Sequence, residues 1–572
     1  MDLSILRHSC SHVMAQAVQS LWPEAKLAIG PSIEDGFYYD FDKPEPFALE
    51  DLEKIELRMR EIIAREEPFQ RRELSKKDAA ALFEKLGETY KLELLNAIPD
   101  EQVSVYRTGG DFVDLCRGPH VGSAADIKAF KLLSIAGAYW HGIETNPMLQ
   151  RIYGTAFDSE EALKKYLDLL EEAKKRDHRK LGKELELFEI YHEEAGAGLV
   201  FYHPRGAILR DILETYEKKE HLRRGYQMVV TPHILKGGLW KTSGHASYYR
   251  ENMYFFDIDE QEYAVKPMNC PGHILIYRSK TRSYRDLPLR LFELGTVYRH
   301  EKSGVLHGLL RVRSFTQDDA HIFCLPEQVK TEIKGVIDFV FDAMELFGFK
   351  ELKIELSTRP AKSIGSDEDW QRATGALKES LEEKHLNYEV NEGDGAFYGP
   401  KIDIKLKDAI GRYWQCATIQ CDFAQAGNFD LNYVGSDGKE YRPVMLHRVI
   451  FGSLERFIGT LIEHYAGNFP VWLSPEQVRI VPIKSECEDF ARQAELLMKA
   501  KDVRVSVDMS SETLNKKIRG AELMKVPYVL VVGPREVASG SVSVRSKTKG
   551  DLGVMKLEDF AARIMGEIEN RN

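Results

Sequence analysis

The pattern of hydrophobic and polar positions divides the first third of the chain into two regions. Apolar residues recur at helical spacing in residues 9–21 and 52–66, among short strand-like runs and glycine turns. In residues 159–186, leucines follow helical spacing and charged residues occupy the other faces, which is typical of a solvated helix that connects two domains. We therefore predict a mixed α+β domain over residues 1–157 and a linker helix over residues 158–186.

Strand-like runs dominate the next region, residues 187–472, with examples in "YQMVVTP", "RLFELGTVYRH", "KIDIKL" and "RYWQCATIQCDF". They follow one another without regular helical crossovers, which favours a largely antiparallel sheet. The last runs, "VRIVPI", "RVSVDM" and "PYVLVVG", are separated by helical stretches, as in a small α/β domain. Pro470 and the Trp472–Pro475 turn mark the seam, so we place this last domain at residues 473–572 of a multidomain α+β protein.

Composition narrows the class of protein. The chain has 572 residues, of which 43% are hydrophobic and 30% charged, as in ordinary globular proteins with several domains. No run approaches the ~18 apolar residues that span a bilayer, and the first ten residues lack a signal-peptide pattern. Seven cysteines fit buried thiols in a reducing compartment better than a disulfide framework. We expect a cytoplasmic protein without a membrane partner.

Charge argues against indiscriminate binding of nucleic acid, because the net charge is −11. The distribution is uneven: residues 474–572 contain 17 Lys+Arg and 15 Asp+Glu, a net of +2. A less acidic tail is compatible with a local RNA contact. No DNA partner is expected.

Three segments of the middle region resemble the three motifs of class II aminoacyl-tRNA synthetases. They are "GYQMVVTPHIL", then "LPLRLFELGTVYRHE" with "LHGLLRVRSFTQDDAHIF", and finally "HRVIFGSLERFIGTLIEHYAG". Each alone is unspecific, but the order and separations are specific together. Nearly the whole chain resembles the threonyl-tRNA synthetase family of class IIa. This resemblance implies an antiparallel catalytic core, an N-terminal editing domain, a C-terminal anticodon-binding domain and a homodimer that acts on ATP, L-threonine and tRNA(Thr).

The chemistry explains the arginines of these motifs. When the carboxylate of an amino acid attacks the α-phosphate of ATP, charge builds on phosphate oxygens, which guanidinium groups bind two at a time. The resemblance implies that Arg299 contacts the α-phosphate, Arg456 the γ-phosphate, and Arg311 the bent triphosphate. Glu301 would face the adenine amino group, and Mg²⁺ would accompany ATP. Any one of these arginines is more often a surface ion pair; the three motifs together favour the site.

A metal site is implied by the resemblance and not by spacing. Cys270, His321 and His447 lie in "KPMNCPGH", "DDAHIF" and "VMLHRVIFGS", at separations of 51 and 126 residues that match no compact zinc finger. The C-x-x-H pair of Cys270 and His273 is a decoy. In the family the three residues hold one Zn²⁺ per subunit, which leaves positions open for the amino and hydroxyl groups of threonine.

The same resemblance implies which other residues bind the amino acid. Asp319 would accept the hydrogen bond of the threonine hydroxyl, and a site that requires this hydroxyl rejects valine. The remaining lining residues would be Met268, Gln317, Tyr398 and Lys401.

Serine also carries a β-hydroxyl, so a second, hydrolytic site is expected. In "RHSCSHVMAQA" His8 and His12 share one helix face, and Cys116 and His120 repeat the spacing in "DLCRGPHVG". Chemistry alone would make these four residues zinc ligands. They resemble the editing domain shared by alanyl- and threonyl-tRNA synthetases, whose threonyl branch implies metal-free hydrolysis by polar groups and water. Lys91 and Asp114 match further editing positions. We expect histidine pKa values near neutrality.

The last domain resembles the anticodon-binding domain of class IIa synthetases through "LNKKIRGAELMKVPYVLVVGPREVASGSVSVRSK". Glu536 and Arg545 match positions near the anticodon, whereas Ser511 stands where many relatives have asparagine. Many family members also have a ubiquitin-like domain before the editing domain, and here that domain is expected to be naturally absent or removed.

Two alternatives compete with this interpretation. One is a synthetase-derived RNA-binding regulator that has lost catalysis, and the other is a different class IIa enzyme such as the prolyl one. The arginines of the motifs argue against the first, and the metal trio and the N-terminal domain argue against the second.

Overall fold

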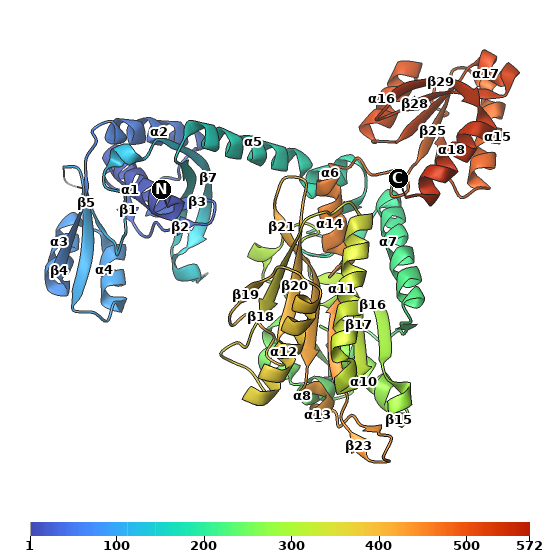
Figure 1. The fold of residues 1–572 in the computed structure, drawn as a ribbon. Helices are drawn as coiled ribbons and strands as arrows, with labels where there is room; N and C mark the ends of the chain where they lie inside the picture. Colours follow the sequence, from blue (N-terminus) through green and yellow to red (C-terminus); the bar gives the residue numbers. More distant parts are fainter. Residues whose placement is uncertain (1, 111, 144, 572) are drawn as a thin grey trace. The chain divides into compact units, whose positions relative to one another are not determined.

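The computed structural model describes residues 2–110, 112–143 and 145–571. The chain divides into two compact units, with the boundary between Glu171 and Glu172 (Figure 1). Within the described residues, none of the helices combines the length and the apolar character needed to traverse a lipid bilayer. Six of the seven free cysteines are buried, and Cys116 is half-buried, so the predicted role of most cysteines as buried thiols is confirmed.

Unit 1 contains two antiparallel sheets with two helices on each. The first has the strand order β1–β3–β8–β7, with β2 paired to β3. Its elements are α1 (Leu3–Leu21), β1 (Lys26–Leu27), β2 (Ser32–Ile33), β3 (Gly36–Asp42), α2 (Leu49–Ile63), β7 (Ala129–Tyr139) and β8 (Met148–Phe157). The second comprises β4 (Phe69–Ser75), α3 (Lys76–Leu86), α4 (Thr89–Ala97), β5 (Gln102–Thr108) and β6 (Phe112–Leu115). The two helices predicted from spacing are therefore present, each starting earlier than predicted.

The predicted single linker helix is wrong. The segment forms α5 (Glu160–Arg176) and α6 (His178–Glu184), separated at Asp177. The Asp177 side chain accepts a hydrogen bond from the backbone N–H of Arg179 and so starts a new helix. Leu163 is the one buried residue among those described in α5, whereas α6 is anchored in unit 2 by His178, whose Nδ1 lies 2.7 Å from Glu463 Oε1. Only the first part of the segment is a solvated helix.

An eight-stranded sheet forms the centre of unit 2, in the order β11–β16–β17–β24–β21–β20–β18–β19. The inner pairings are antiparallel, as predicted, and only the edge strands β11 and β19 pair in parallel. The strands are β11 (Gln227–Met228), β16 (Leu289–Tyr298), β17 (Ser314–Cys324), β18 (Leu352–Ser357), β19 (Glu389–Asn391), β20 (Lys401–Lys407), β21 (Tyr413–Asp422) and β24 (Val444–Val449).

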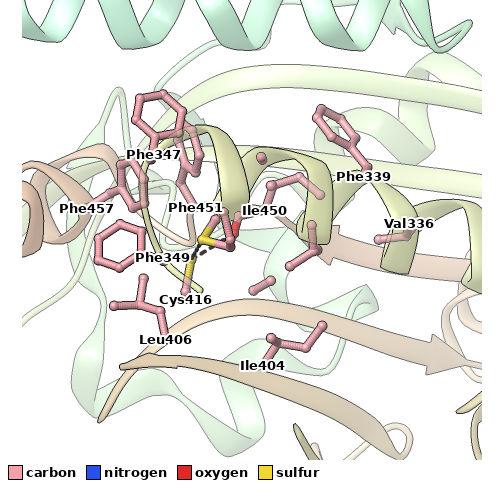
Figure 2. Packing of buried hydrophobic residues seen from close by; sticks show 14 of the residues in the cluster. Val336, Phe339, Phe347, Phe349, Ile404, Leu406, Cys416, Ile450, Phe451 and Phe457 are labelled. Carbon is pink, nitrogen blue, oxygen red and sulfur yellow. Dashed lines mark hydrogen bonds between the residues drawn. The ribbon is translucent and has the colours of Figure 1, made fainter. Parts of the chain in front are cut away.

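Helices cover one face of this sheet and leave the other for the site. Helices α11 (Val329–Leu346) and α12 (Asp367–Glu383) pack on β20, β21 and β24, while α14 (Leu454–His464) packs on β17 and on α7 (Pro204–Arg223) (Figure 1). Figure 2 shows the core between them, where the rings of Phe451 and Phe457 stack 3.9 Å apart and Cys416 donates to the carbonyl of Ile450 (3.0 Å). The thiol thus satisfies its polarity inside an apolar core.

Unit 2 also contains smaller elements outside the eight-stranded sheet. They include α8 (Gly237–Thr242), α9 (His245–Tyr248), α10 (Cys270–Arg278), α13 (Gln425–Asn428), a sheet of β12 (Ile234–Lys236), β13 (Tyr254–Ile258) and β14 (Gln261–Val265), and another of β15 (Arg282–Ser283), β22 (Tyr433–Val434) and β23 (Glu440–Tyr441). β9 (Phe188–Glu189) pairs with β10 (Phe201–Tyr202).

The end of the chain forms a five-stranded sheet in the order β26–β25–β27–β28–β29. Its elements are β25 (Val478–Pro482), α15 (Glu488–Lys499), β26 (Val505–Val507), α16 (Leu514–Leu523), β27 (Tyr528–Val532), α17 (Pro534–Ser539), β28 (Ser541–Ser546), β29 (Gly550–Lys556) and α18 (Leu557–Glu569). β26, β25 and β27 are parallel, as the predicted α/β pattern requires. An ion pair between Arg205 and Glu476 (2.7 Å) joins α7 to the segment before β25.

Candidate active sites

Four neighbouring strands place one row of polar side chains on the open face of the large sheet. Lys401 on β20 is paired with Gln420 on β21, Gln420 with His447 on β24, and His447 with His321 on β17. Residues in cross-strand register point to the same face, so these side chains converge despite their distance in sequence. They line a cavity of about 440 Å³.

Most of the predicted catalytic and substrate residues line this cavity. They are Met268, Cys270, Arg299, Gln317, Asp319, His321, Tyr398, Lys401, His447 and Arg456. Gln317, Asp319 and His321 are alternate residues of β17 and share its face. The sequence interpretation missed Thr418 and Gln420, which also line the cavity. The period-two alternation of β21 was the signal that could have found them, because they alternate with Ala417, Ile419 and Cys421 of the apolar core.

The three predicted metal ligands lie together. Donor atoms of Cys270, His321 and His447 are all within 4.8 Å of one another, and the three residues are buried. His321 Nε2 is 3.0 Å from His447 Nδ1, near the ~3.3 Å edge of a tetrahedron with Zn–N bonds of ~2.0–2.1 Å. Burial raises the pKa of the Cys270 thiol and lowers that of His321. The donor set fits Zn²⁺, which binds thiolate and neutral imidazole.

Carboxylates flank this cluster. Asp422 Oδ2 is 2.7 Å from His447 Nε2, which leaves Nδ1 as the nitrogen that faces His321. Asp319 Oδ1 is 3.8 Å from His321 Nε2, and Asn269 donates to its other oxygen (3.1 Å). Asp422 is a residue that the sequence interpretation missed, although it continues the alternate face of Thr418 and Gln420.

The predicted arginines differ in burial. Arg299 donates to the carbonyl of Pro267 (3.2 Å) and lies over the ring of Phe315. Arg456 is held by the carbonyl of Leu310 (3.2 Å), and burial lowers its pKa. Arg311 does not line the main cavity; it lines a neighbouring one that also includes Arg456. It forms an ion pair with Glu301 (2.9 Å), so two predicted ATP-binding side chains contact each other.

Unit 1 has a second cluster of histidine and cysteine. His8 and His12 lie one turn apart on α1, and Cys116 Sγ is 3.3 Å from His8 Nε2 and 3.2 Å from His120 Nε2. Donor atoms of all four residues lie within 4.8 Å of one another. Ser9 donates to the Ile5 carbonyl, so its oxygen accepts from His120 Nδ1 (3.1 Å) and leaves Nε2 facing the thiol.

The other two predicted editing residues form a buried ion pair beside this cluster. Lys91 Nζ is 2.5 Å from Asp114 Oδ1, and His12 Nδ1 is 3.5 Å from Asp114 Oδ2. Tyr39, which the sequence interpretation missed, donates to Asp114 (2.6 Å) and accepts from Lys91 (2.8 Å). The charges of Lys91 and Asp114 therefore balance each other inside the unit.

The expected near-neutral pKa of the histidines in unit 1 is wrong. Burial lowers the pKa of His8, lowers that of His12 to about 3, and lowers that of His120 strongly. Burial also raises the pKa of the Cys116 thiol to about 11. Desolvation penalises the charged form in each case, so imidazoles and thiol are neutral at pH 7.

The predicted anticodon residues lie on separate elements. Glu536 on α17 accepts a hydrogen bond from the backbone N–H of Gly533 (2.9 Å) and thereby caps its helix. Arg545 is exposed on β28. No hydrogen bond or ion pair joins the two in the part of the chain that the structure describes.

Comparisons with known proteins agree over most of the chain. Residues 254–465 match the tRNA synthetase class II core domain (G, H, P, S and T), and residues 477–567 match an anticodon-binding domain. Residues 103–153 match the threonyl and alanyl tRNA synthetase second additional domain. A threonine–tRNA ligase of Oleidesulfovibrio alaskensis is 59% identical over 567 residues, covering 99% of this chain and 88% of the relative. The chain belongs to the threonine–tRNA ligase family.

Other members of this family support the assignment. A threonine–tRNA ligase of Citrifermentans bemidjiense is 59% identical, covering 99% of this chain and 89% of its own. The crystal structure of the RNA binding domain of threonyl-tRNA synthetase from Cryptosporidium parvum has a TM-score of 0.66 at 41% identity, covering 68% of this chain and 98% of that one. The predicted fold class, a class II core between an editing-type and an anticodon-binding domain, is confirmed. The prolyl alternative is wrong.

Proposed function

We propose that this chain joins L-threonine to tRNA(Thr) in the cavity of unit 2 and removes mischarged serine at the cluster of unit 1. Membership in the threonine–tRNA ligase family supports the first activity. The second additional domain, common to threonyl and alanyl synthetases, supports the second. The observation that carries the proposal is the row of His321, His447, Gln420 and Lys401 beside Arg299 and Arg456 in one cavity.

In the activation step the carboxylate of threonine attacks the α-phosphate of ATP, and pyrophosphate leaves. Arg299 and Arg456 border the cavity as held guanidinium groups, so their charge is in place before phosphate charge develops. Arg311 is exposed and would turn from Glu301 toward the triphosphate, which releases Glu301 for the adenine amino group. Mg²⁺ accompanies ATP in class II synthetases and neutralises phosphate charge.

Cys270, His321 and His447 would hold one Zn²⁺ per subunit. When bound there, zinc supplies Lewis-acid coordination for an amino and a hydroxyl group. Asp319 lies beside His321 and would accept the hydroxyl hydrogen of threonine, with its orientation fixed by Asn269. Valine has no hydroxyl to donate, so it would leave this buried carboxylate oxygen without its hydrogen bond. Sites of this kind reject the analogue that lacks the hydroxyl by ~10⁴–10⁵-fold. Serine keeps the hydroxyl, so it passes.

Hydrolysis of seryl-tRNA would use the neutral groups of unit 1. The imidazoles of His8 and His12 are unprotonated at pH 7, because burial lowers the pKa of each, so their ring nitrogens can accept a hydrogen bond from the attacking water and orient it. Lys91 and Asp114 stabilise charge within the same site. We propose hydrolysis without metal there.

The decisive experiment is pyrophosphate exchange with ATP and each of threonine, serine, valine, proline and alanine. We expect exchange with threonine, weaker exchange with serine, and none above background with the others. Arg299→Ala should reduce exchange by about 10²–10³-fold, because one preorganised charge is lost. Exchange with proline or alanine but not threonine would contradict the proposal.

Two further assignments concern RNA and assembly. Arg545 is proposed to contact the anticodon, so Arg545→Ala should raise the KM for tRNA and leave pyrophosphate exchange unchanged.

A homodimer is proposed through the first motif. Its exposed apolar side chains are Met228, Val230 (83% exposed) and Ile234, and exposed Leu222 lies just before it; together they are more than isolated surface residues require. Val230→Asp should shift the sedimentation coefficient toward that of a monomer.

A further inference from the structure

A chain of buried side chains continues behind His321, away from the cavity. His273 Nδ1 on α10 is 2.8 Å from His321 Nδ1, and His273 Nε2 is 3.2 Å from Glu293 Oε2 on β16. Lys266 Nζ is 3.1 Å from the other oxygen of Glu293. All four residues are at most 3% exposed. We propose that Glu293 and His273 are positioning residues that fix the ring of His321 with the lone pair of Nε2 facing the cavity.

The donor and acceptor of each hydrogen bond in this chain follow from the state of the Glu293 carboxylate. The carboxylate accepts from Lys266 and from both the backbone N–H and the hydroxyl of Thr231. Burial alone would raise the pKa of Glu293, but the hydrogen bonds from His273 and Thr231 and the charge of Lys266 lower it to about 2. An ionised carboxylate only accepts hydrogen bonds, so His273 Nε2 must donate to it.

The tautomers of both imidazoles follow. A neutral His273 that carries its proton on Nε2 has a lone pair on Nδ1, which therefore accepts from His321 Nδ1. His321 then has its lone pair on Nε2, the nitrogen 3.0 Å from His447 Nδ1.

The two proposed histidine ligands are thus oriented by different means. Asp422 accepts directly from His447 Nε2, whereas the carboxylate of Glu293 acts on His321 through the ring of His273. His273 was the decoy of the C-x-x-H pair; both of its ring nitrogens are engaged, so it supports a ligand instead of being one. Partners of this kind typically change metal affinity by ~10–100-fold when removed.

The inference rests on the proposed zinc site, and the test separates the two. Zinc loss from the full-length protein is followed with a chromogenic chelator, and bound Co²⁺ is followed by its absorption spectrum. His273→Phe keeps a ring but removes the acceptor, so zinc loss should be 10–100-fold faster. His273→Asn places an amide oxygen near the position of Nδ1 and should restore most of the retention. The thiolate–Co²⁺ band should persist in both, because Cys270 is unchanged.

Two variants serve as control and as a second measurement. His464→Phe makes the same substitution in a half-buried histidine that contacts Phe349 and Tyr465 and does not line the cavity, and it should retain zinc like the parent. Glu293→Gln removes the charge that directs the relay and should accelerate zinc loss about 10-fold; it decides the question if His273→Phe does not fold.

Three results would overturn the relay. They are unchanged zinc loss in His273→Phe, equal impairment in His273→Asn and His273→Phe, and, where His273→Phe is unfolded, unchanged loss in Glu293→Gln. A parent protein that binds neither Zn²⁺ nor Co²⁺ would overturn the zinc site itself, whereas a binding parent with indifferent variants leaves the site and removes only the relay.

Discussion

The two Cys/His clusters offer the same donor atoms in different electrostatic surroundings. In unit 2, Asp422 and Asp319 lie beside the donors, and no lysine pairs with either among the described ion pairs. In unit 1, Asp114 is already paired with Lys91 at 2.5 Å. A cation at the cluster of unit 2 would be attracted by carboxylates that no lysine neutralises among the described ion pairs. At the cluster of unit 1 it would meet a carboxylate that Lys91 already neutralises.

Coordination number separates the clusters as well. Cys270, His321 and His447 are three donors, which leaves one position of a tetrahedral site, or two of a five-coordinate site, open for a substrate. His8, His12, Cys116 and His120 are four donors, and a metal bound by all of them would have no position left. Donor type alone therefore does not decide between metal chemistry and proton chemistry; neighbouring charge and open coordination positions do.

The largest effect is expected on zinc content and threonine activation, and it should distinguish the Cys270 thiol from the Cys116 thiol. Cys270→Ser should lose the bound zinc and reduce threonine activation by at least about 10²-fold, because the thiolate ligand is gone. The matched variant Cys116→Ser should change neither. Metal content and the rate of pyrophosphate exchange are measured for both variants and for the parent protein. Loss of a metal equivalent from Cys116→Ser would show that the cluster of unit 1 also binds metal.

The histidines of unit 1 should affect hydrolysis alone. His8→Ala combined with His12→Ala should slow deacylation of seryl-tRNA by ~10²–10⁴-fold, the usual contribution of acid–base groups. Threonine activation and zinc content should stay at parental levels, as they should for the exposed control His141→Ala. Seryl-tRNA hydrolysis at the parental rate would contradict the editing assignment.

Charge balance in unit 1 can be tested through stability. Lys91→Met leaves Asp114 buried without its cation, which should destabilise unit 1 by about 3–5 kcal/mol. Hydrogen exchange of amides in α1 and β6 measures this locally. Adding Asp114→Asn should recover part of the loss, since the uncompensated charge is removed. Unchanged exchange in Lys91→Met would show that the pair contributes little.

The smallest expected effect is on the pH dependence of the folding stability of unit 1. Burial lowers the pKa of His12 from 6.5 to about 3, so the unfolded state binds the extra proton between these values. Stability therefore falls as pH drops below 6.5, by about 2 kcal/mol between pH 6.5 and pH 5 for one such histidine. His12→Gln should reduce the pH slope of hydrogen-exchange protection in unit 1 by about one proton. A slope that is identical in both proteins would contradict the burial argument.

Sequence patterns predicted the layers of the fold well, because each depends on local spacing. The antiparallel centre and the α/β end follow from runs such as "RYWQCATIQCDF" and "PYVLVVG". The break at Asp177 was missed, since charge periodicity continues across it and only the cap starts a new helix.

The candidate sites depended on resemblance more than on spacing. No local pattern connects Cys270 with His447, because helix α10 and strand β24 meet only in the tertiary fold. Asp422, Gln420 and Tyr39 were missed for the same reason, although alternation along β21 offered a partial signal for the first two. The pKa of His12 could not be predicted from residue type, since it depends on burial.

The register of β17 against β24 sets His321 directly opposite His447. Because side chains alternate between the faces of a strand, a slip of one residue would turn one of these imidazoles into the helix-covered side of the sheet. A chain that had closed its sheet out of step would turn the apolar side chains of that strand away from the core and would lack the paired imidazoles. Zinc uptake during refolding would therefore report the moment at which the two strands have found their correct alignment, independently of any assay of catalysis.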